Sequence, residues 1–153
     1  MNSTDPDDKL AKAKQAALRL LKIRSRSEKE IRERLKLKKF SGEIIEEILE
    51  HLKKVQLVDD RQFTKDWINA RLTKPFGLRR ISFELRKKGI DDELLKEELA
   101  FVQVNYPEDD IVIALAKQRA ARYKETDKTV LKKRVFNYLA YRGFNIDAIQ
   151  KAI

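Results

Sequence analysis

Residues 81–99, ISFELRKKGIDDELLKEEL, contain the pattern that determines the fold. Six of their apolar positions recur about fifty residues earlier, in IRERLKLKKFSGEIIEEIL (31–49), and about fifty residues later, in VFNYLAYRGFNIDAIQKAI (135–153). The aligned positions are Ile31, Leu35, Phe40, Ile44, Ile45 and Leu49, then Ile81, Leu85, Ile90, Leu94, Leu95 and Leu99, then Val135, Leu139, Phe144, Ala148, Ile149 and Ile153. Because so short a unit cannot bury its apolar face alone, the three copies are expected to pack on their neighbours.

Each copy is expected to form three helices. In the first copy, apolar residues spaced for one helix face predict a helix over 8–24. Ser27 with Glu30 three residues later forms a capping box, which predicts a second helix that ends near Lys39. Ser41 is expected to cap the third helix.

The other two copies repeat this order and contain no strand alternation of useful length, so the predicted fold class is all-α. Helices are expected over 60–72 and 78–88, after Asp91 or Asp92, from Pro107 to about 123, after Thr126-Asp127 as far as 142, and after Asn145. The domains predicted are a disordered acidic head over 1–8 and three tandem three-helix repeats, helix-turn-helix-like, over 9–57, 58–105 and 106–153. We expect them to form an elongated curved rod.

The turn after the second helix of the first copy lacks the glycine found in the other two copies. Lys39 occupies the position that glycine holds at Gly89 and Gly143. If the turn is shared, Lys39 must adopt a positive φ, which costs about 1 kcal/mol. A shorter or differently closed turn in the first copy is the alternative.

Composition limits the possible functions. The chain has no cysteine, which excludes disulfides, thiolate catalysis and cysteine-ligated zinc. It has no apolar leader and no apolar run of about eighteen residues, so we expect a soluble cytoplasmic protein, not bound to membranes. The net charge of +10 indicates an anionic partner, with nucleic acid the foremost candidate, although such an excess can also serve solubility alone.

Catalysis fits the sequence poorly. The one histidine, His51, is expected to be a solvated residue on the side of its helix away from Ile48 and Leu52. Phosphate loops and metal-ligand spacings are absent. We therefore predict no enzyme activity, no catalytic residues, no metal and no cofactor, and nothing requires more than a monomer.

Basic side chains crowd around the second helix of each copy, whereas the third helices of the first two copies are acidic. Cations at helix C-termini, such as Lys38, Lys88 and Arg142, have a structural explanation because they complement the helix dipole. The better functional candidates precede their helices, where the dipole disfavours cations; they are Arg24, Arg26, Arg79 and Arg80.

Most aromatic side chains at helical spacing are expected in the core and not on a base-stacking surface; they are Phe63, Trp67, Phe101 and Tyr123. The positions of Phe76, Tyr106 and Tyr141, at joints or near the ends of units, leave their role open. Phe76 could be either a packing plug or a contact residue.

Several segments, in order along the chain, resemble the RecX family. They are IRSRSEKEI (23–31), LVDDRQF (57–63), GLRRI (77–81), ELRKKGI (84–90) and LAYRGF (139–144). The resemblance covers roughly residues 9 to 153 and departs from the family at Lys39, where the first turn usually carries glycine. It implies tandem three-helix repeats in a regulator of the bacterial RecA recombinase.

The resemblance further implies binding along the groove of the RecA–single-stranded DNA filament and inhibition of its ATPase and strand-exchange activities. The implied partners are thus the RecA filament and single-stranded DNA, contacted directly or through the filament. Basic side chains would meet acidic protein or phosphates, giving salt-sensitive binding. The hypothesis is that this contact is made by Arg24, Arg26, Arg32, Arg79, Arg80, Arg86, Lys87 and Arg134.

Three alternatives remain. Each three-helix unit could be a helix-turn-helix reader of duplex DNA, but phosphates would repel the acidic third helices of the first two copies. Non-specific nucleic-acid binding without recombinase regulation is the main alternative. A helical adaptor unrelated to DNA is the third.

Overall fold

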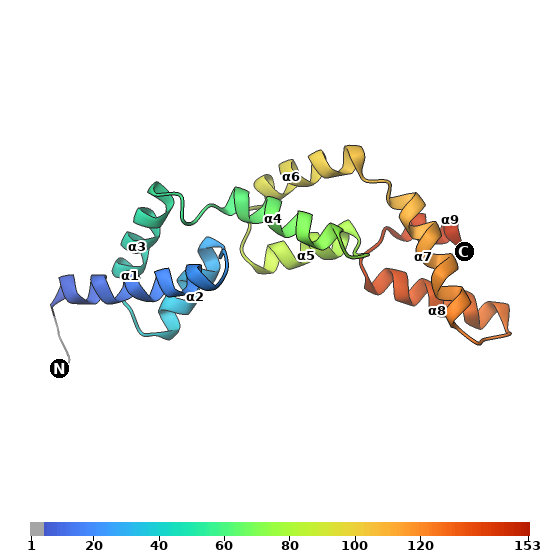
Figure 1. Ribbon diagram of the computed structural model, residues 1–153, viewed down its shortest axis with the longest axis horizontal. Helices are drawn as coiled ribbons and strands as arrows, with labels where there is room; N and C mark the ends of the chain where they lie inside the picture. Colours follow the sequence, from blue (N-terminus) through green and yellow to red (C-terminus); the bar gives the residue numbers. More distant parts are fainter. Residues whose placement is uncertain (1–4) are drawn as a thin grey trace. The chain divides into compact units, whose positions relative to one another are not determined.

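The computed structural model describes residues 5–153, and within that range it contains nine α-helices and no strand (Figure 1). The predicted all-α class is therefore confirmed. The helices are α1 (Pro6–Ile23), α2 (Glu28–Leu37), α3 (Gly42–Lys54), α4 (Asp60–Leu72), α5 (Leu78–Lys87), α6 (Asp92–Asn105), α7 (Glu108–Arg122), α8 (Lys128–Tyr141) and α9 (Ile146–Ala152).

The predicted capping residues begin the helices. At α2, the Ser27 hydroxyl accepts a hydrogen bond from the Glu30 N–H at 3.2 Å, and the Glu30 carboxylate accepts one from the Ser27 N–H at 3.1 Å. This reciprocal pair is the capping box expected from the sequence. Side chains of Ser41, Asp127 and Asn145 likewise accept N–H bonds at the starts of α3, α8 and α9.

The N-terminal prediction needs a correction. Residues 1–4 of the expected disordered head lie outside the described residues. Residues 5–8 are ordered, because α1 begins at Pro6 with Asp5 as its N-cap, earlier than the sequence indicated. Proline suits the first helical position, since its fixed φ is already helical, and Asp7 and Asp8 complement the helix dipole.

The aligned apolar positions form the core. All are buried or partly buried except Ile153, the last residue, which is 37 % exposed. In the first copy, three alanines of α1 (Ala13, Ala16 and Ala17) pack against the apolar faces of α2 and α3. Phe63 is buried as predicted, but Phe101 is 77 % exposed, so its predicted core position is wrong.

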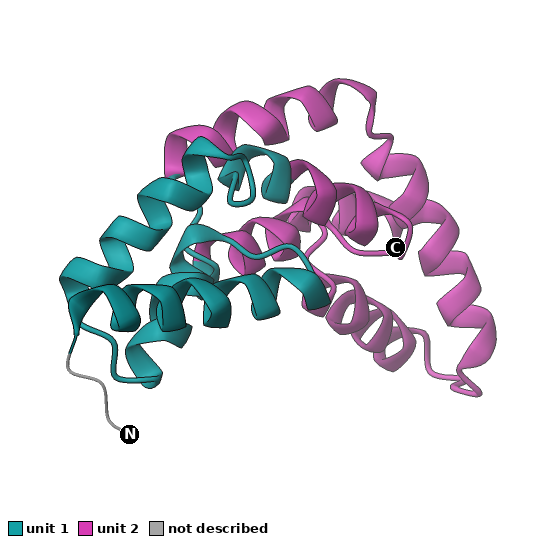
Figure 2. Ribbon diagram, turned by 60° about the vertical axis from the view of Figure 1, so that its left-hand side comes forward, with its two compact units in different colours: residues 1–64, 87–91 teal, residues 65–86, 92–153 magenta. Residues whose placement is uncertain are grey.

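The chain divides into two compact units (Figure 2). Unit 1 comprises Met1–Thr64 and Lys87–Asp91, and unit 2 comprises Lys65–Arg86 and Asp92–Ile153. Unit 1 thus includes the turn after α5. The predicted repeat boundaries at 57/58 and 105/106 are not tested by this division and stay predictions.

The start of α2 explains why that turn belongs to unit 1. The Ser27 hydroxyl donates a 2.7 Å hydrogen bond to the Lys88 carbonyl, and the Lys29 ammonium donates one to the Lys87 carbonyl at 3.3 Å. Gly89 closes the turn with φ +80° and lies against the Lys29 side chain. Ser27 is fully buried by this contact.

An equivalent joint forms inside unit 2, at the start of α5. The Gly77 N–H donates a 2.8 Å hydrogen bond to the Arg142 carbonyl, and the Arg79 N–H donates one to the Gly143 carbonyl at 3.2 Å. Gly143 has φ +85°. In both joints, the turn after a basic second helix therefore packs on the start of the second helix one copy earlier.

Lys39 adopts the shared turn. Its φ is +69°, and the following N–H, that of Phe40, donates to the Leu35 carbonyl at 3.3 Å. The third copy has the same closure, from the Phe144 N–H to the Leu139 carbonyl at 3.3 Å. The shorter-turn alternative is therefore wrong.

Candidate arginine-rich binding sites

In unit 1, Arg24 is held by a carboxylate. Its guanidinium pairs with Glu30, whose carboxylate also meets the Lys88 ammonium at 3.4 Å. Burial pushes the pKa of Glu30 upward, but hydrogen bonds from Arg24 and from the Ser27 N–H, together with the Lys88 charge, bring it below its ordinary value. Arg24 is thus partly a structural residue that holds the start of α2.

Arg32 is more completely paired. Its guanidinium bridges Glu28 of its own helix at 3.0 Å and Glu46 of α3 at 2.7 Å. The hydrogen bond to Glu46 is the main reason that the pKa of Arg32 is raised. A side chain that satisfies two carboxylates joins α2 to α3, and this structural role competes with the predicted contact role.

Arg26 lies between Arg24 and the capping Ser27 and is only partly exposed. Its Nε is buried and has no hydrogen-bond partner within residues 5–153. Burial, followed by the charge of Arg24, lowers its pKa. The Glu30 charge acts in the opposite direction, but the unsatisfied Nε–H leaves this guanidinium suited to donate to an external anion.

In unit 2, Arg79 and Arg80 differ sharply. Both lie within the first turn of α5 and not before the helix, which corrects the predicted placement. Arg79 is exposed, and its guanidinium has no partner in the described part of the chain. Arg80 is stacked over Phe76 at 4.7 Å and Tyr141 at 5.2 Å and pairs with Glu84 at 3.3 Å.

The remaining predicted contact residues are exposed. Arg86 lies 3.5 Å from Asp92, and both side chains are more than half exposed, so this pair holds Arg86 weakly. Lys87, in unit 1, and Arg134, on α8, also face solvent. The Arg134 guanidinium lies 4.1 Å from the centre of the Tyr123 ring.

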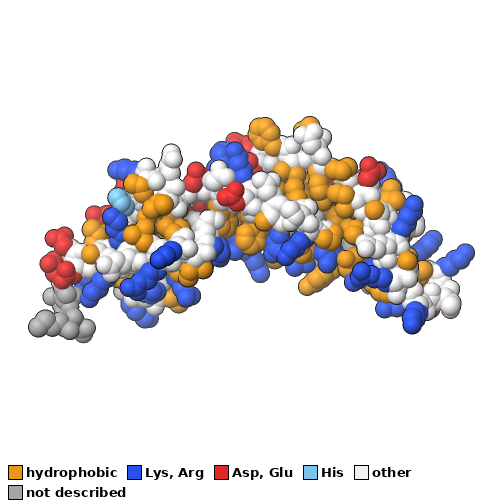
Figure 3. All heavy atoms as spheres, viewed as in Figure 1, with side chains coloured by type: hydrophobic (Ala, Val, Ile, Leu, Met, Phe, Trp, Pro, Cys, Tyr) orange, Lys and Arg blue, Asp and Glu red, His pale blue; other side chains and the backbone are white. Residues whose placement is uncertain are grey.

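Unit 2 contains a run of alternating arginines and aromatic rings that the sequence patterns did not predict. Arg71, Arg80 and Arg142 all lie over Phe76, at 4.7 to 4.9 Å from its centroid. Phe76 is therefore a packing residue within a cationic cluster, which resolves its open role. Figure 3 shows Lys and Arg side chains along the α5 and α8 side of this unit, and exposed hydrophobic ones on α6.

Glu84 holds two arginines of this run in place through ion pairs. Its Oε2 accepts hydrogen bonds from the Trp67 Nε1 at 2.9 Å and from the Arg71 Nε at 2.8 Å, and its Oε1 accepts from Arg80. The Glu84 side chain is only 15 % exposed, and its bonds to Trp67 and Arg71 join α4 to α5 inside unit 2. The three arginines over Phe76 come from α4, α5 and the end of α8, so local sequence patterns carry no signal for this cluster.

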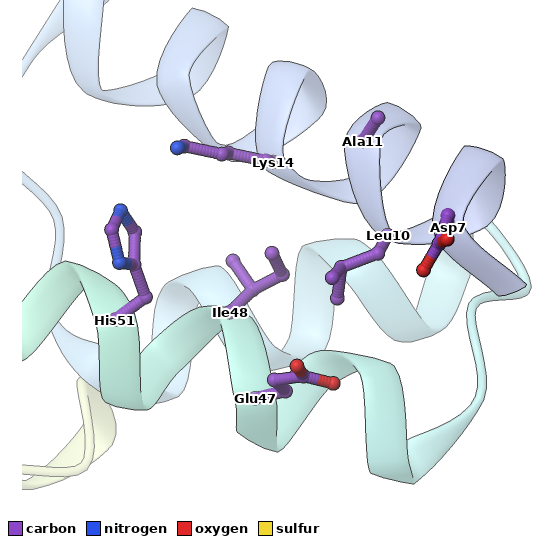
Figure 4. A pocket seen from close by; sticks show the side chains of 7 residues that line it. All are labelled: Asp7, Leu10, Ala11, Lys14, Glu47, Ile48 and His51. Atoms are coloured by element: carbon purple, nitrogen blue, oxygen red, sulfur yellow. The ribbon is translucent and has the colours of Figure 1, made fainter.

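An open pocket of about 310 Å³ lies between α1 and α3 in unit 1. Figure 4 shows Leu10 and Ile48 in its wall, with Lys14 and His51 at one end. His51 is exposed as predicted, but it lies beside Ile48 and not on the opposite side. Among the described residues, no group of three or more His, Asp or Glu side chains could hold a metal ion.

Comparisons with known proteins cover almost the whole chain. Three family models match the chain in order. They are described as "RecX, first three-helix domain" (residues 13–52), "RecX, second three-helix domain" (59–99) and "RecX, third three-helix domain" (107–153). The chain belongs to the RecX family. The resemblance expected from the sequence segments, and the tandem three-helix architecture that it implied, are confirmed.

Two RecX relatives show how far the similarity extends. The "Regulatory protein RecX" of Clostridium acetobutylicum is 34% identical over 150 residues, which is 96% of this chain and 70% of the relative. That of Prosthecochloris aestuarii is 33% identical over 148 residues, covering 96% of this chain and 95% of the relative. RecX is thus a family of regulatory proteins, to which this chain corresponds over nearly its full span.

Solved RecX structures have the same fold. The crystal structure of RecX from Lactobacillus salivarius superposes with a TM-score of 0.81 at 25% identity and covers 95% of both chains. A second crystal structure, of a regulatory protein RecX, gives a TM-score of 0.83 at 26% identity over 95% of this chain and 73% of the other. As for membranes, none of the helices in residues 5–153 is both long and apolar enough to span one.

Proposed function

We propose that this RecX-family chain is a regulator that binds filaments of the RecA recombinase on single-stranded DNA and inhibits their ATPase and strand-exchange activities. The observation that carries the proposal is the match to all three RecX domains in order along the chain. The chain acts as a monomer in the cytoplasm, without a cofactor and without catalysis of its own.

The three similar units of the chain give a physical reason to expect binding to a filament. A filament presents the same surface at regular intervals, and a chain of similar units can make several weak contacts in series. Linked contacts raise the overall affinity above that of any one contact, because the second binding event is intramolecular. The basic second helices of the three copies supply comparable positive charge to each contact.

Arg79 is the best single contact candidate in the predicted set. Its guanidinium is exposed and has no partner within residues 5–153, so binding an anion breaks no interaction. Arg32 and Arg80 already pair with carboxylates, and their replacement would also disturb packing. Arg79→Ala is therefore a cleaner test of the contact than any replacement that includes Arg80.

Co-sedimentation with preformed RecA filaments on single-stranded DNA tests the proposal. Wild-type protein is expected to pellet with the filaments, and Arg79→Ala is expected to bind about tenfold more weakly with unchanged helix content. Lys96→Ala is the matched control, since it removes one exposed positive charge from α6, which the predicted site excludes. Absence of wild-type protein from the pellet would refute filament binding.

Non-specific nucleic-acid binding without recombinase regulation is the second candidate, which the net charge of +10 favours. The two proposals differ in one measurement. A plain nucleic-acid binder should bind bare single-stranded DNA at least as tightly as filament-coated DNA at the same salt concentration. A filament regulator should prefer the coated strand.

A further inference from the structure

A second pocket lies entirely within unit 2 and differs in chemistry from the pocket in unit 1. Its volume is about 230 Å³, and its wall combines α7, the end of α8 and the segment before α5. Three arginines contribute to it: Arg119, Arg122 and Arg142. No acidic residue lines it, although acidic residues make up a large part of this chain.

The Tyr138 ring orients two of these arginines. The Arg119 guanidinium lies 3.9 Å from the ring centre, and the Arg142 guanidinium lies 5.1 Å from it. Stacking occupies the face of a guanidinium and leaves its in-plane N–H groups free to donate hydrogen bonds. Arg142 uses one of these donors on the Pro75 carbonyl, at 3.0 Å, which fixes it at the pocket wall.

One buried donor of this pocket lacks an acceptor. The Arg119 Nε is buried and has no hydrogen-bond partner in residues 5–153, and over the same range neither Arg119 nor Arg122 has an ion-pair partner. Buried donors are nearly always satisfied in native proteins, so an unsatisfied one beside an open polar pocket indicates a missing partner. Mutually repelling cations indicate that this partner is an anion.

We propose that this pocket binds a phosphate group. A phosphate is tetrahedral and carries up to two negative charges, so it can accept hydrogen bonds from several guanidinium groups that approach from different directions. A single carboxylate is planar and is satisfied by one arginine fork. The phosphate comes from the free ion or from a nucleic-acid strand, and only the second source rests on the function proposed above.

The test starts with inorganic phosphate and no recombinase. In the full-length protein at slightly acidic pH, the side-chain Nε–Hε resonances of Arg119 and Arg142 are followed by NMR during a phosphate titration at constant ionic strength. Saturable shifts of both resonances are expected. No saturable shift, or the same shift with chloride alone, would overturn the proposal, as would equal binding of an acidic peptide.

Variants that each remove one positive charge show whether phosphate binds in the pocket. Arg122→Gln is expected to weaken phosphate binding about tenfold or more, because it removes a charged donor from an exposed side chain without altering the core. Arg119→Gln should weaken it further. Lys117→Gln, on the same helix but outside the pocket, should leave it unchanged. Equal weakening by Lys117→Gln would show a diffuse charge effect and contradict the proposal.

Oligonucleotides then identify the source of the phosphate. If single strands compete with inorganic phosphate whether or not they carry a 5′-phosphate, the pocket recognises backbone phosphates. If only the 5′-phosphorylated strand competes, the pocket recognises the phosphate at a strand end. If neither strand competes, the pocket serves free phosphate. Because the titration contains no RecA, its failure leaves the proposed filament binding intact, and failed filament binding leaves the pocket proposal intact.

Discussion

The close approach of two glycines in unit 2 gives the sharpest prediction about stability. A Cβ on Gly77 would lie 2.2 Å from the Gly143 carbonyl oxygen and 2.3 Å from its carbonyl carbon. These are backbone atoms, so neither can move aside as a flexible side chain would. In Gly77→Ala, the turn after α8 must separate from the start of α5.

The magnitude follows from the bonds lost at that joint. Separation breaks the hydrogen bonds from the Gly77 N–H to the Arg142 carbonyl and from the Arg79 N–H to the Gly143 carbonyl. Each contributes about 1 kcal/mol, and the displaced packing adds a comparable amount. The lower unfolded-state entropy of alanine returns up to about 1 kcal/mol. We therefore expect a loss of about 2 kcal/mol.

Urea unfolding measures this loss. Trp67 is the single tryptophan of the chain and lies in unit 2, so its fluorescence reports on the affected unit, while circular dichroism reports on all helices. Gly42→Ala is the matched control, because nothing lies within 4 Å of the Cβ it adds at the start of α3. A Gly77→Ala free energy of unfolding within about 0.5 kcal/mol of wild type would show that this joint tolerates a Cβ and would contradict the prediction.

Three further predictions use the same unfolding assay. Lys39→Gly should stabilise the protein by about 0.5 kcal/mol or more, since φ +69° strains a lysine but not a glycine; a loss of stability would contradict this. Ser27→Ala should destabilise by about 2 kcal/mol, because it removes both the helix cap and the bond to the Lys88 carbonyl; a change under about 0.5 kcal/mol would argue against the joint. The lowered pKa of Glu30 means that its ionised form stabilises the fold above the unfolded pKa of about 4.3, and that this stability is lost as the pH falls through the folded pKa. Glu30→Gln should therefore lose less stability than wild type on acidification below about pH 5, and parallel pH profiles would rule out this contribution.

Local signals in the sequence predicted the helices well. Ser27, Ser41, Asp127 and Asn145 were recognised as caps because a cap depends on residues within one helical turn. The repeat alignment likewise predicted which apolar side chains enter the core. The glycine turns were readable because positive φ restricts the choice of residue, and the alignment identified Lys39 as the exception.

Features that depend on distant segments were not predictable. The joint at the start of α5 connects residues far apart in sequence, and the Arg142 side chain reaches Pro75 across 67 positions. The roles of Arg32 and Arg80 as ion-pair partners also depend on packing between helices. Phe101 follows the helical period of a core residue, yet its face of α6 meets solvent, because periodicity defines a face without showing what covers it.

The pocket lined by Arg119, Arg122 and Arg142 illustrates the same limit. In the sequence, Arg142 had a structural explanation as a cation at a helix C-terminus, and no pattern singled out Arg119 or Arg122. Only the fold brings α7 against the end of α8 and shows a buried Arg119 Nε without a partner. The phosphate titration tests whether these residues bind an anion together.

The measurement that tests the central proposal most directly is ATP hydrolysis by preformed RecA filaments on excess single-stranded DNA, titrated with this protein at moderate salt. Excess DNA minimises simple competition for free strand. A filament regulator should inhibit hydrolysis well below one molecule per recombinase subunit. Unchanged hydrolysis, together with tight salt-dependent binding to bare DNA, would contradict the proposal and leave a nucleic-acid-binding protein with the RecX fold.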